Sequence, residues 1–117
     1  RKIIFPRDGV KNERGGFEDI GPETIRLFAS VLLKARTIIW NGPLGRVEVS
    51  EFTKGTKEVA KVIARSDAFT IIGGGDTIAF LRKYRLLREF DHVSTGGGAM
   101  LEFLAGKKLP GIEALRR

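Results

Sequence analysis

The chain contains no cysteine and only one histidine among its 117 residues. Without cysteine it can form no disulfide bond, thiolate nucleophile or cysteine-based metal site, and one histidine cannot supply the usual histidine cluster. Any bound metal must therefore be a hard cation held by oxygen atoms, often with help from a bound phosphate.

Long apolar runs are also missing. No segment approaches the roughly 18 consecutive apolar residues of a membrane span, and no charged, then apolar, then small-residue pattern opens the chain. Hydrophobic residues make up 42% of the sequence and charged residues 30%, a balance typical of a soluble globular domain. We expect a cytoplasmic protein with no membrane partner.

The excess of basic over acidic residues gives a net charge of +7, which raises the question of nucleic acid. The densest basic segment contains Arg82, Lys83, Arg85 and Arg88. Leucines alternate with these cations as on a solvated helix face, and Tyr84 is the only aromatic residue among them. We therefore expect a solvated surface, with nucleic-acid binding as the less favoured alternative.

Glycine is plentiful, and two glycine triplets stand out. The first, Gly73 to Gly75, follows the apolar run 68–72 and precedes Asp76 and Thr77, while the second, Gly96 to Gly98, follows a short β-like run. Either triplet alone is explained by a tight turn between a strand and a helix. Because glycine lets backbone N–H groups converge on an anion at a helix N-terminus, the pair favours a phosphate or nucleotide site.

Apolar periodicity predicts an alternation of strands and helices. The expected strands are residues 3–5, 37–40, 68–72 and 92–94, and the expected helices are residues 22–35, 52–63, 78–90 and 99–104. Residues 7–16 are expected to form a loop and 107–117 a tail with little periodicity. The pattern predicts one Rossmann-like α/β domain over residues 1–117, a three-layer parallel sheet of about four strands with flanking helices.

Two consequences follow from a parallel sheet. Residues 37–40 are apolar in succession, so we expect this strand to be covered on both faces. Ligands of such sheets bind at the carboxyl ends of the strands. Three loops are expected there: 41–48, 73–77 and 94–98.

At these loops the sequence resembles a known family. The matching segments, in order, are Asp19 to Pro22, Trp40 to Gly45 with Glu48 and Phe52, Gly55-Thr56, Gly73 to Thr77, His92 to Ala99, and Leu109 to Gly111. They resemble phosphoglycerate kinase, specifically the later part of its C-terminal, nucleotide-binding domain. The likeness covers almost the whole chain.

The resemblance implies roles for the first glycine triplet. Asp76 is similar to the carboxylate that meets the magnesium ion of the Mg-nucleotide, and Thr77 with the amides of Gly74 and Gly75 resembles the phosphate contacts. One aspartate is enough, because magnesium usually keeps several waters and takes few protein ligands. The alternative for Asp76 is a helix N-cap with no metal role.

The resemblance also assigns the remaining site residues. Glu48 is similar to the residue that hydrogen-bonds the nucleotide ribose, and Asn41 and Pro43 to residues that line the phosphate and nucleotide site. Taken alone, Glu48 would be a surface charge and Asn41 to Pro43 a plain turn. Trp40 and His92 are expected to be structural.

Gly96, Gly97 and Gly98 complete the implied set as catalytic residues. Their amides would lie where negative charge collects on the transferred phosphoryl group. Phosphoryl transfer depends mainly on such positioning and electrostatic stabilisation.

The implied function is the nucleotide-side part of glycolytic phosphoryl transfer between ATP and 3-phosphoglycerate, in which 1,3-bisphosphoglycerate and ADP give 3-phosphoglycerate and ATP. The family's 3-phosphoglycerate-binding domain and earlier nucleotide-binding segment have no counterpart here. We therefore expect an incomplete domain that binds nucleotide or phosphate weakly at most, is inactive alone and self-associates. The alternative is a non-enzymatic minimal α/β module that binds an anion or nucleotide.

Overall fold

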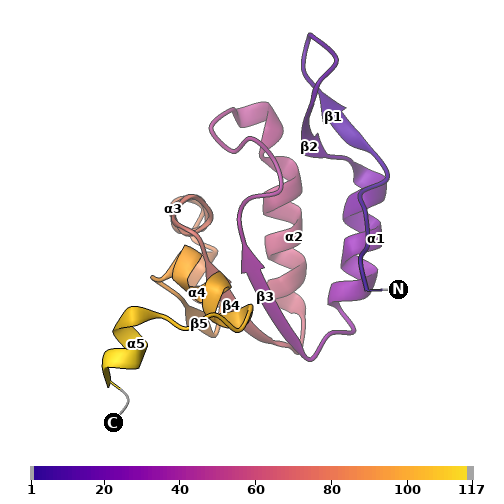
Figure 1. Ribbon diagram of the computed structural model, residues 1–117. Coiled ribbons are helices and arrows are strands. Elements are labelled where there is room, and N and C mark those ends of the chain that lie inside the picture. Colours follow the sequence, from indigo (N-terminus) through magenta and orange to yellow (C-terminus); the bar gives the residue numbers. More distant parts are fainter. Residues whose placement is uncertain (1, 116–117) are drawn as a thin grey trace.

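The structure is a computed structural model that describes residues 2–115. Its elements are β1 (Gly9–Lys11), β2 (Phe17–Ile20), α1 (Pro22–Leu32), β3 (Thr37–Asn41), α2 (Lys54–Arg65), β4 (Phe69–Gly73), α3 (Gly75–Lys83), β5 (His92–Val93), α4 (Gly97–Leu104) and α5 (Pro110–Leu115), with 3₁₀ turns at Ser50–Phe52 and Leu87–Glu89. Figure 1 shows their arrangement. Within the described part, every helix is too short or too polar to cross a membrane.

The predicted α/β fold with a parallel sheet and flanking helices is confirmed. Strands β3, β4 and β5 form this sheet in that order, and all of their pairings are parallel. Asn41 at the end of β3 lies opposite Gly73 at the end of β4. The carboxyl ends of neighbouring strands therefore meet at one edge, as the sequence predicted.

The predicted strand at residues 3–5 is wrong, so the sheet contains three strands where about four were expected. These residues adopt no regular structure and are exposed. The segment instead runs beside α1 (Figure 1). It is held there because the backbone N–H groups of Arg7 and Asp8 donate to Thr24 Oγ1 at 2.9 and 3.0 Å.

The expected loop at residues 7–16 is also wrong, because it contains a strand. β1 pairs antiparallel with β2 in a separate two-stranded ribbon. Asn12 shapes the connecting turn, since its Oδ1 accepts the N–H groups of Arg14 and Gly16. These strands are short and polar, so they carry no apolar alternation that a sequence pattern could show.

The core lies on one face of the sheet. Ile38 and Trp40 of β3 and Ile72 of β4 are buried there. They belong to one cluster with Val59, Ala60 and Ile63 of α2 and with Phe80 and Leu81 of α3. Trp40 also donates from Nε1 to the carbonyl of Gly42 at 2.6 Å, so it packs as a structural residue, as expected.

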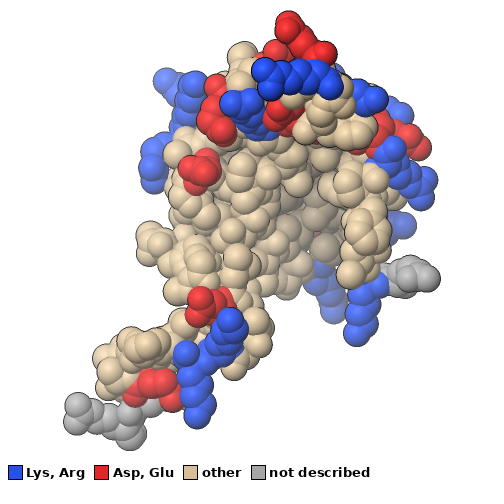
Figure 2. Space-filling view, turned by 45° about the horizontal axis from the view of Figure 1, so that its top comes forward, with Lys and Arg blue, Asp and Glu red and all other residues tan. Residues whose placement is uncertain are grey.

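The opposite face of the sheet is largely uncovered. Ile39 is 44% exposed and Phe69 is 53% exposed, so the expectation that residues 37–40 are covered on both faces is wrong. In the view of Figure 1, α2 lies behind β3 and α1 stands beside α2. Figure 2 shows a broad surface nearly free of charged side chains, with charges gathered around its rim.

The third helix ends earlier than predicted. α3 stops at Lys83 and does not continue toward Phe90. Arg85 then adopts a positive φ of 59°, and the N–H groups of Arg85 and Leu86 bond back to the carbonyls of Arg82 and Leu81. This hydrogen-bond pattern is a Schellman motif, which terminates a helix. Near the C-terminus, α5 lies in the tail for which the sequence showed little periodicity.

Candidate functional site

The two glycine triplets meet at the carboxyl edge of the sheet. A Cβ atom added at Gly97 would lie 3.4 Å from the backbone nitrogen of Gly74 and 3.5 Å from its Cα. Gly74 itself has a φ of 93° and precedes the first turn of α3, a conformation that side chains with a Cβ disfavour. The structure thus brings the first turns of α3 and α4 into contact.

Asn41 and Thr77 complete this junction, which we define as Asn41, Gly74, Thr77 and Gly97. A Cβ atom added at Gly74 would lie 3.3 Å from Asn41 Oδ1 and 3.4 Å from Thr77 Oγ1. A Cβ atom at Gly97 would lie 4.0 Å from Asn41 Nδ2. Four predicted site residues from three different loops therefore surround one small space.

Two polar atoms at the junction lack partners. Among the described residues, Asn41 Nδ2 and Thr77 Oγ1 are buried and form no hydrogen bond, and Thr77 has no exposed surface. An unsatisfied buried polar group costs about 1–3 kcal/mol and calls for an explanation such as a ligand. Two helix N-termini start beside these atoms, and their N–H groups favour an anion.

The other predicted glycines line the opening of this junction. A Cβ atom at Gly75 or Gly98 would have no atom within 4 Å, and one at Gly96 would be no closer than 3.8 Å to any. Gly75, Gly96 and Gly98 are exposed. Their backbone groups are therefore open to a ligand at the first turns of α3 and α4.

Asp76 is exposed in the first turn of α3 and forms no hydrogen bond or ion pair with another described residue. The alternative reading as an N-cap is wrong, because Gly74 occupies that position and α3 has no side-chain cap bond. No group of three or more His, Cys, Asp or Glu residues in the described chain could hold a metal. The arrangement fits a magnesium ion that shares one carboxylate with the phosphate oxygens of its nucleotide.

Glu48 and Pro43 lie outside the junction. Glu48 is exposed in the turn between Arg46 and Val49, and it forms no hydrogen bond or ion pair with a described residue. Pro43 lines a separate cavity of about 520 Å³. The structure therefore does not bring these two residues to the glycine turns.

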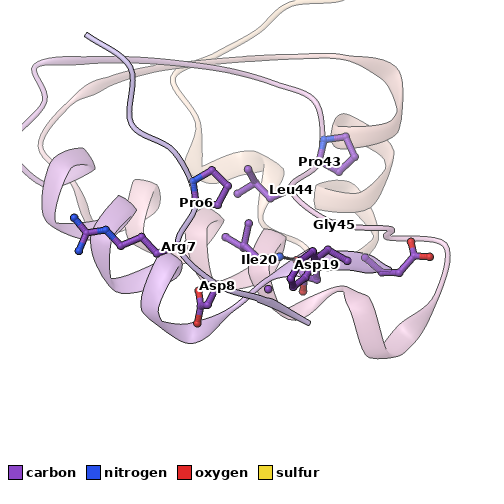
Figure 3. Close-up of a pocket in the computed structure, with 11 residues that line it drawn as sticks. Pro6, Arg7, Asp8, Asp19, Ile20, Pro43, Leu44 and Gly45 are labelled. Atoms are coloured by element: carbon purple, nitrogen blue, oxygen red, sulfur yellow. Dashed lines mark hydrogen bonds between the residues drawn. The ribbon is translucent and has the colours of Figure 1, made fainter. Parts of the chain in front are cut away.

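This cavity lies between the β1–β2 ribbon and the loop after β3. Its lining comes from Pro6 to Gly9, Phe17 to Ile20 and Pro43 to Gly45. Figure 3 shows Leu44 and Ile20 between Pro6 and Pro43. The cavity is joined to the junction through the loop that runs from Asn41 to Gly45.

The acidic residues of the cavity wall have structural roles. Asp19 is buried and accepts the N–H groups of Ile20 at 2.8 Å and Gly55 at 2.9 Å. Asp8 accepts the backbone N–H of Thr24 at 2.8 Å, and the hydrogen bond from the Thr24 hydroxyl lowers the pKa of Asp8 below its ordinary value. Sequence reasoning assigned no role to Asp19, although its place before a Gly-Pro helix start was part of the matched motif.

Comparison with known proteins assigns the family. The family model of phosphoglycerate kinase matches residues 2–107. The phosphoglycerate kinase of Salinispora tropica is 56% identical over 109 residues, which cover 92% of this chain and 27% of the relative. That of Pseudothermotoga lettingae is 50% identical over 115 residues, covering 98% of this chain and 29% of the relative. The chain belongs to the phosphoglycerate kinase family.

Solved structures agree with this assignment. The structure of phosphoglycerate kinase from Coxiella burnetii matches with a TM-score of 0.79 at 47% identity, over 84% of this chain and 25% of that one. The enzyme from Pyrococcus horikoshii matches with a TM-score of 0.78 at 49% identity, over 86% of this chain and 24% of that one. The chain thus spans about a quarter of the length of these relatives.

Replacing Thr77 by valine tests whether its buried hydroxyl serves a ligand. Without ligand, we expect Thr77→Val to raise the free energy of unfolding by about 1 kcal/mol, because an unsatisfied hydroxyl is removed at nearly constant volume. Urea unfolding measures this change, and calorimetric titration with inorganic phosphate should show weaker binding.

Thr56→Val is the matched control. Thr56 is equally buried, but its hydroxyl accepts the N–H of Leu44 at 3.1 Å, so this change should lower the stability. A loss of stability in Thr77→Val as large as in Thr56→Val would show that the Thr77 hydroxyl has a structural partner and would contradict the ligand role.

Proposed function

We propose that the chain supplies the nucleotide side of phosphoglycerate kinase, the phosphoryl transfer between ATP and 3-phosphoglycerate in the cytoplasm. The observation that carries the proposal is the contact between the two glycine turns around the unpartnered atoms Asn41 Nδ2 and Thr77 Oγ1. A phosphate at this point would satisfy both atoms and meet the N-termini of two helices.

The glycine turns suit the chemistry of this transfer. The amides of Gly74 and Gly75 would hold phosphate oxygens at the first turn of α3, and those of Gly96 to Gly98 would stabilise charge on the transferred group. Such stabilisation is effective because the donors are already in place before the reaction. Magnesium, bound with the nucleotide at Asp76, would neutralise part of the phosphate charge.

The rest of the nucleotide would extend toward the neighbouring cavity. Its volume of about 520 Å³ lies in the range of small-molecule sites, and Pro43 would line the path from the phosphates. We assign the ribose contact to Glu48, which is exposed and has no competing partner among the described residues.

Replacing Asp76 by alanine tests the magnesium role. Asp76 makes no cap bond, so Asp76→Ala should leave the fold intact and weaken binding of Mg-ADP while affecting ADP in EDTA little. Calorimetric titration of both proteins measures these affinities. Glu113→Ala, which removes a carboxylate on α5, should bind Mg-ADP like the parent. Equal Mg-ADP affinity in Asp76→Ala and the parent would contradict the proposal.

The 117-residue chain alone should not transfer phosphate to 3-phosphoglycerate. Catalysis here depends on holding both reactants in line, and the site described above provides for the nucleotide only. A coupled assay with ATP and 3-phosphoglycerate should show no turnover by the purified chain. Steady turnover that rises with chain concentration would contradict this. The non-enzymatic alternative also predicts no turnover. A full-length relative distinguishes the two, because only the kinase proposal requires its counterpart of Asp76 for turnover.

We further propose that copies of the chain associate through the uncovered face of the sheet. Ile39 and Phe69 are exposed there, and parallel sheets are normally covered on both faces. The net charge of +7 opposes association, but it is screened beyond about 8 Å at physiological salt, so contact between apolar surfaces should win.

Light scattering at micromolar concentration should therefore report a species larger than the monomer, and Phe69→Lys should shift it to the monomer. Phe17→Lys is the control, because Phe17 is 67% exposed on the separate β1–β2 ribbon. A purely monomeric parent protein, or equal effects of the two variants, would refute association through the sheet face.

A further inference from the structure

A second hollow lies at the opposite edge of the sheet from the glycine turns, between the end of α3 and the start of β5. It measures about 490 Å³ and is lined by Arg82, Arg85, Leu87, Arg88, Phe90 and Val93. Phe90 is buried against Trp40, with ring centroids 6.1 Å apart, so the floor is fixed to the core. The hollow therefore combines an apolar floor with three arginine side chains at its walls.

The charges of these arginines are not neutralised within the described chain. None of the three guanidinium groups forms an ion pair or hydrogen bond with another described residue, and all three residues are exposed. Lys83, from the same basic segment, is different because its Nζ lies 5.6 Å from the centroid of the Tyr84 ring. The segment is exposed, as expected, but it is not one helix face, because α3 ends at Lys83 and the arginines line the hollow.

Arg85 occupies a backbone conformation that favours glycine. Its φ is 59°, and it follows α3 at the position of the Schellman motif where glycine is the usual residue. Arginine at this position costs stability. The side chain of this strained residue lines the same hollow as two other arginines. Local backbone strain of this kind points to a function.

We propose that this hollow binds a small organic phosphate with a compact apolar body. The forked guanidinium group matches the oxygens of a phosphate, and Leu87, Phe90 and Val93 would cover the apolar part. The volume is in the range of small-molecule sites. This hollow and the glycine junction lie at opposite edges of the sheet, so this proposal does not depend on the proposed phosphoglycerate kinase function.

The probe for this site is 1-naphthyl phosphate, which carries both required parts. In two-dimensional ¹H–¹⁵N NMR spectra of the full chain, we expect it to shift the backbone amides of residues 82–93. Inorganic phosphate and 1-naphthol each lack one part, so each should bind these residues at least about fivefold more weakly. Shifts confined to residues 74–77 and 96–98 would place the phosphate at the glycine junction and overturn the proposal.

Replacing Arg85 by glycine separates binding from folding. Glycine suits the positive φ, so Arg85→Gly should unfold at the same or a higher temperature while its affinity for 1-naphthyl phosphate falls about fivefold. Arg14→Ala is the control, because it removes the same charge from the exposed β1–β2 turn and should leave the affinity unchanged. Unchanged affinity in Arg85→Gly, or an equal loss in Arg14→Ala, would overturn the proposal.

A titration with a short single-stranded RNA tests whether the hollow binds the phosphates of a nucleic acid and not a small organic phosphate. At equal phosphate concentration it should shift residues 82–93 less than 1-naphthyl phosphate does, since its phosphates carry no compact apolar group. A stronger and strongly salt-dependent response to the RNA at the same amides would overturn the small-molecule proposal in favour of nucleic-acid binding.

Discussion

The candidate site depends on the close packing around Gly74. A Cβ atom here would lie 3.3 Å from Asn41 Oδ1, and the φ of 93° is itself unfavourable for other residues. The first turn of α4 lies against the same backbone, since a Cβ atom at Gly97 would lie 3.4 Å from the nitrogen of Gly74. The cost of this arrangement is the pair of unpartnered buried atoms on Asn41 and Thr77. A bound phosphate would remove that cost by accepting hydrogen bonds from both atoms.

The parallel sheet sets up this packing. The register places Asn41 opposite Gly73, and Ser94, just after β5, donates its N–H to the carbonyl of Ile72 at 2.7 Å. The loops that follow the three strands are therefore held at one edge of the sheet. Their residues come from positions 41, 74, 77 and 97, which only the fold brings together. In this chain, which spans about a quarter of the length of its relatives, β3, β4 and β5 form this edge, and α2 and α3 connect them.

Sequence reasoning predicted the parts of the fold that carry a strong local signal. The glycine triplets at the end of β4 and after β5 marked the turns correctly. The helix start at Pro22 was found because proline favours the first turn of a helix. The β1–β2 ribbon was missed because its two strands are short and lack the apolar alternation that marks a strand. The early end of α3 was missed because Arg85 stands where glycine normally signals a helix terminus.

The site was predictable in its residue types but not in its geometry. Asn41, Gly74 and Thr77 were named from the motif, yet the missing hydrogen bonds of Asn41 Nδ2 and Thr77 Oγ1 depend on what packs around them. The exposed positions of Asp76 and Glu48 likewise follow from the turns in which they lie. The arginine-lined hollow combines residues of a helix end, a 3₁₀ turn and a strand. A charge pattern alone indicates that such residues are exposed, but it does not show that they surround a hollow.

The most direct test of the central claim is an NMR titration of the ¹⁵N-labelled chain with Mg-ADP. We predict that the backbone amides of Gly74 to Thr77 and Gly96 to Gly98, together with the side-chain amide of Asn41, shift along one binding curve with a single dissociation constant. That result would show both glycine turns and the buried amide meeting the same ligand. Separate curves for the two turns, or no shift of the Asn41 side chain while the backbone responds, would contradict a shared phosphate site.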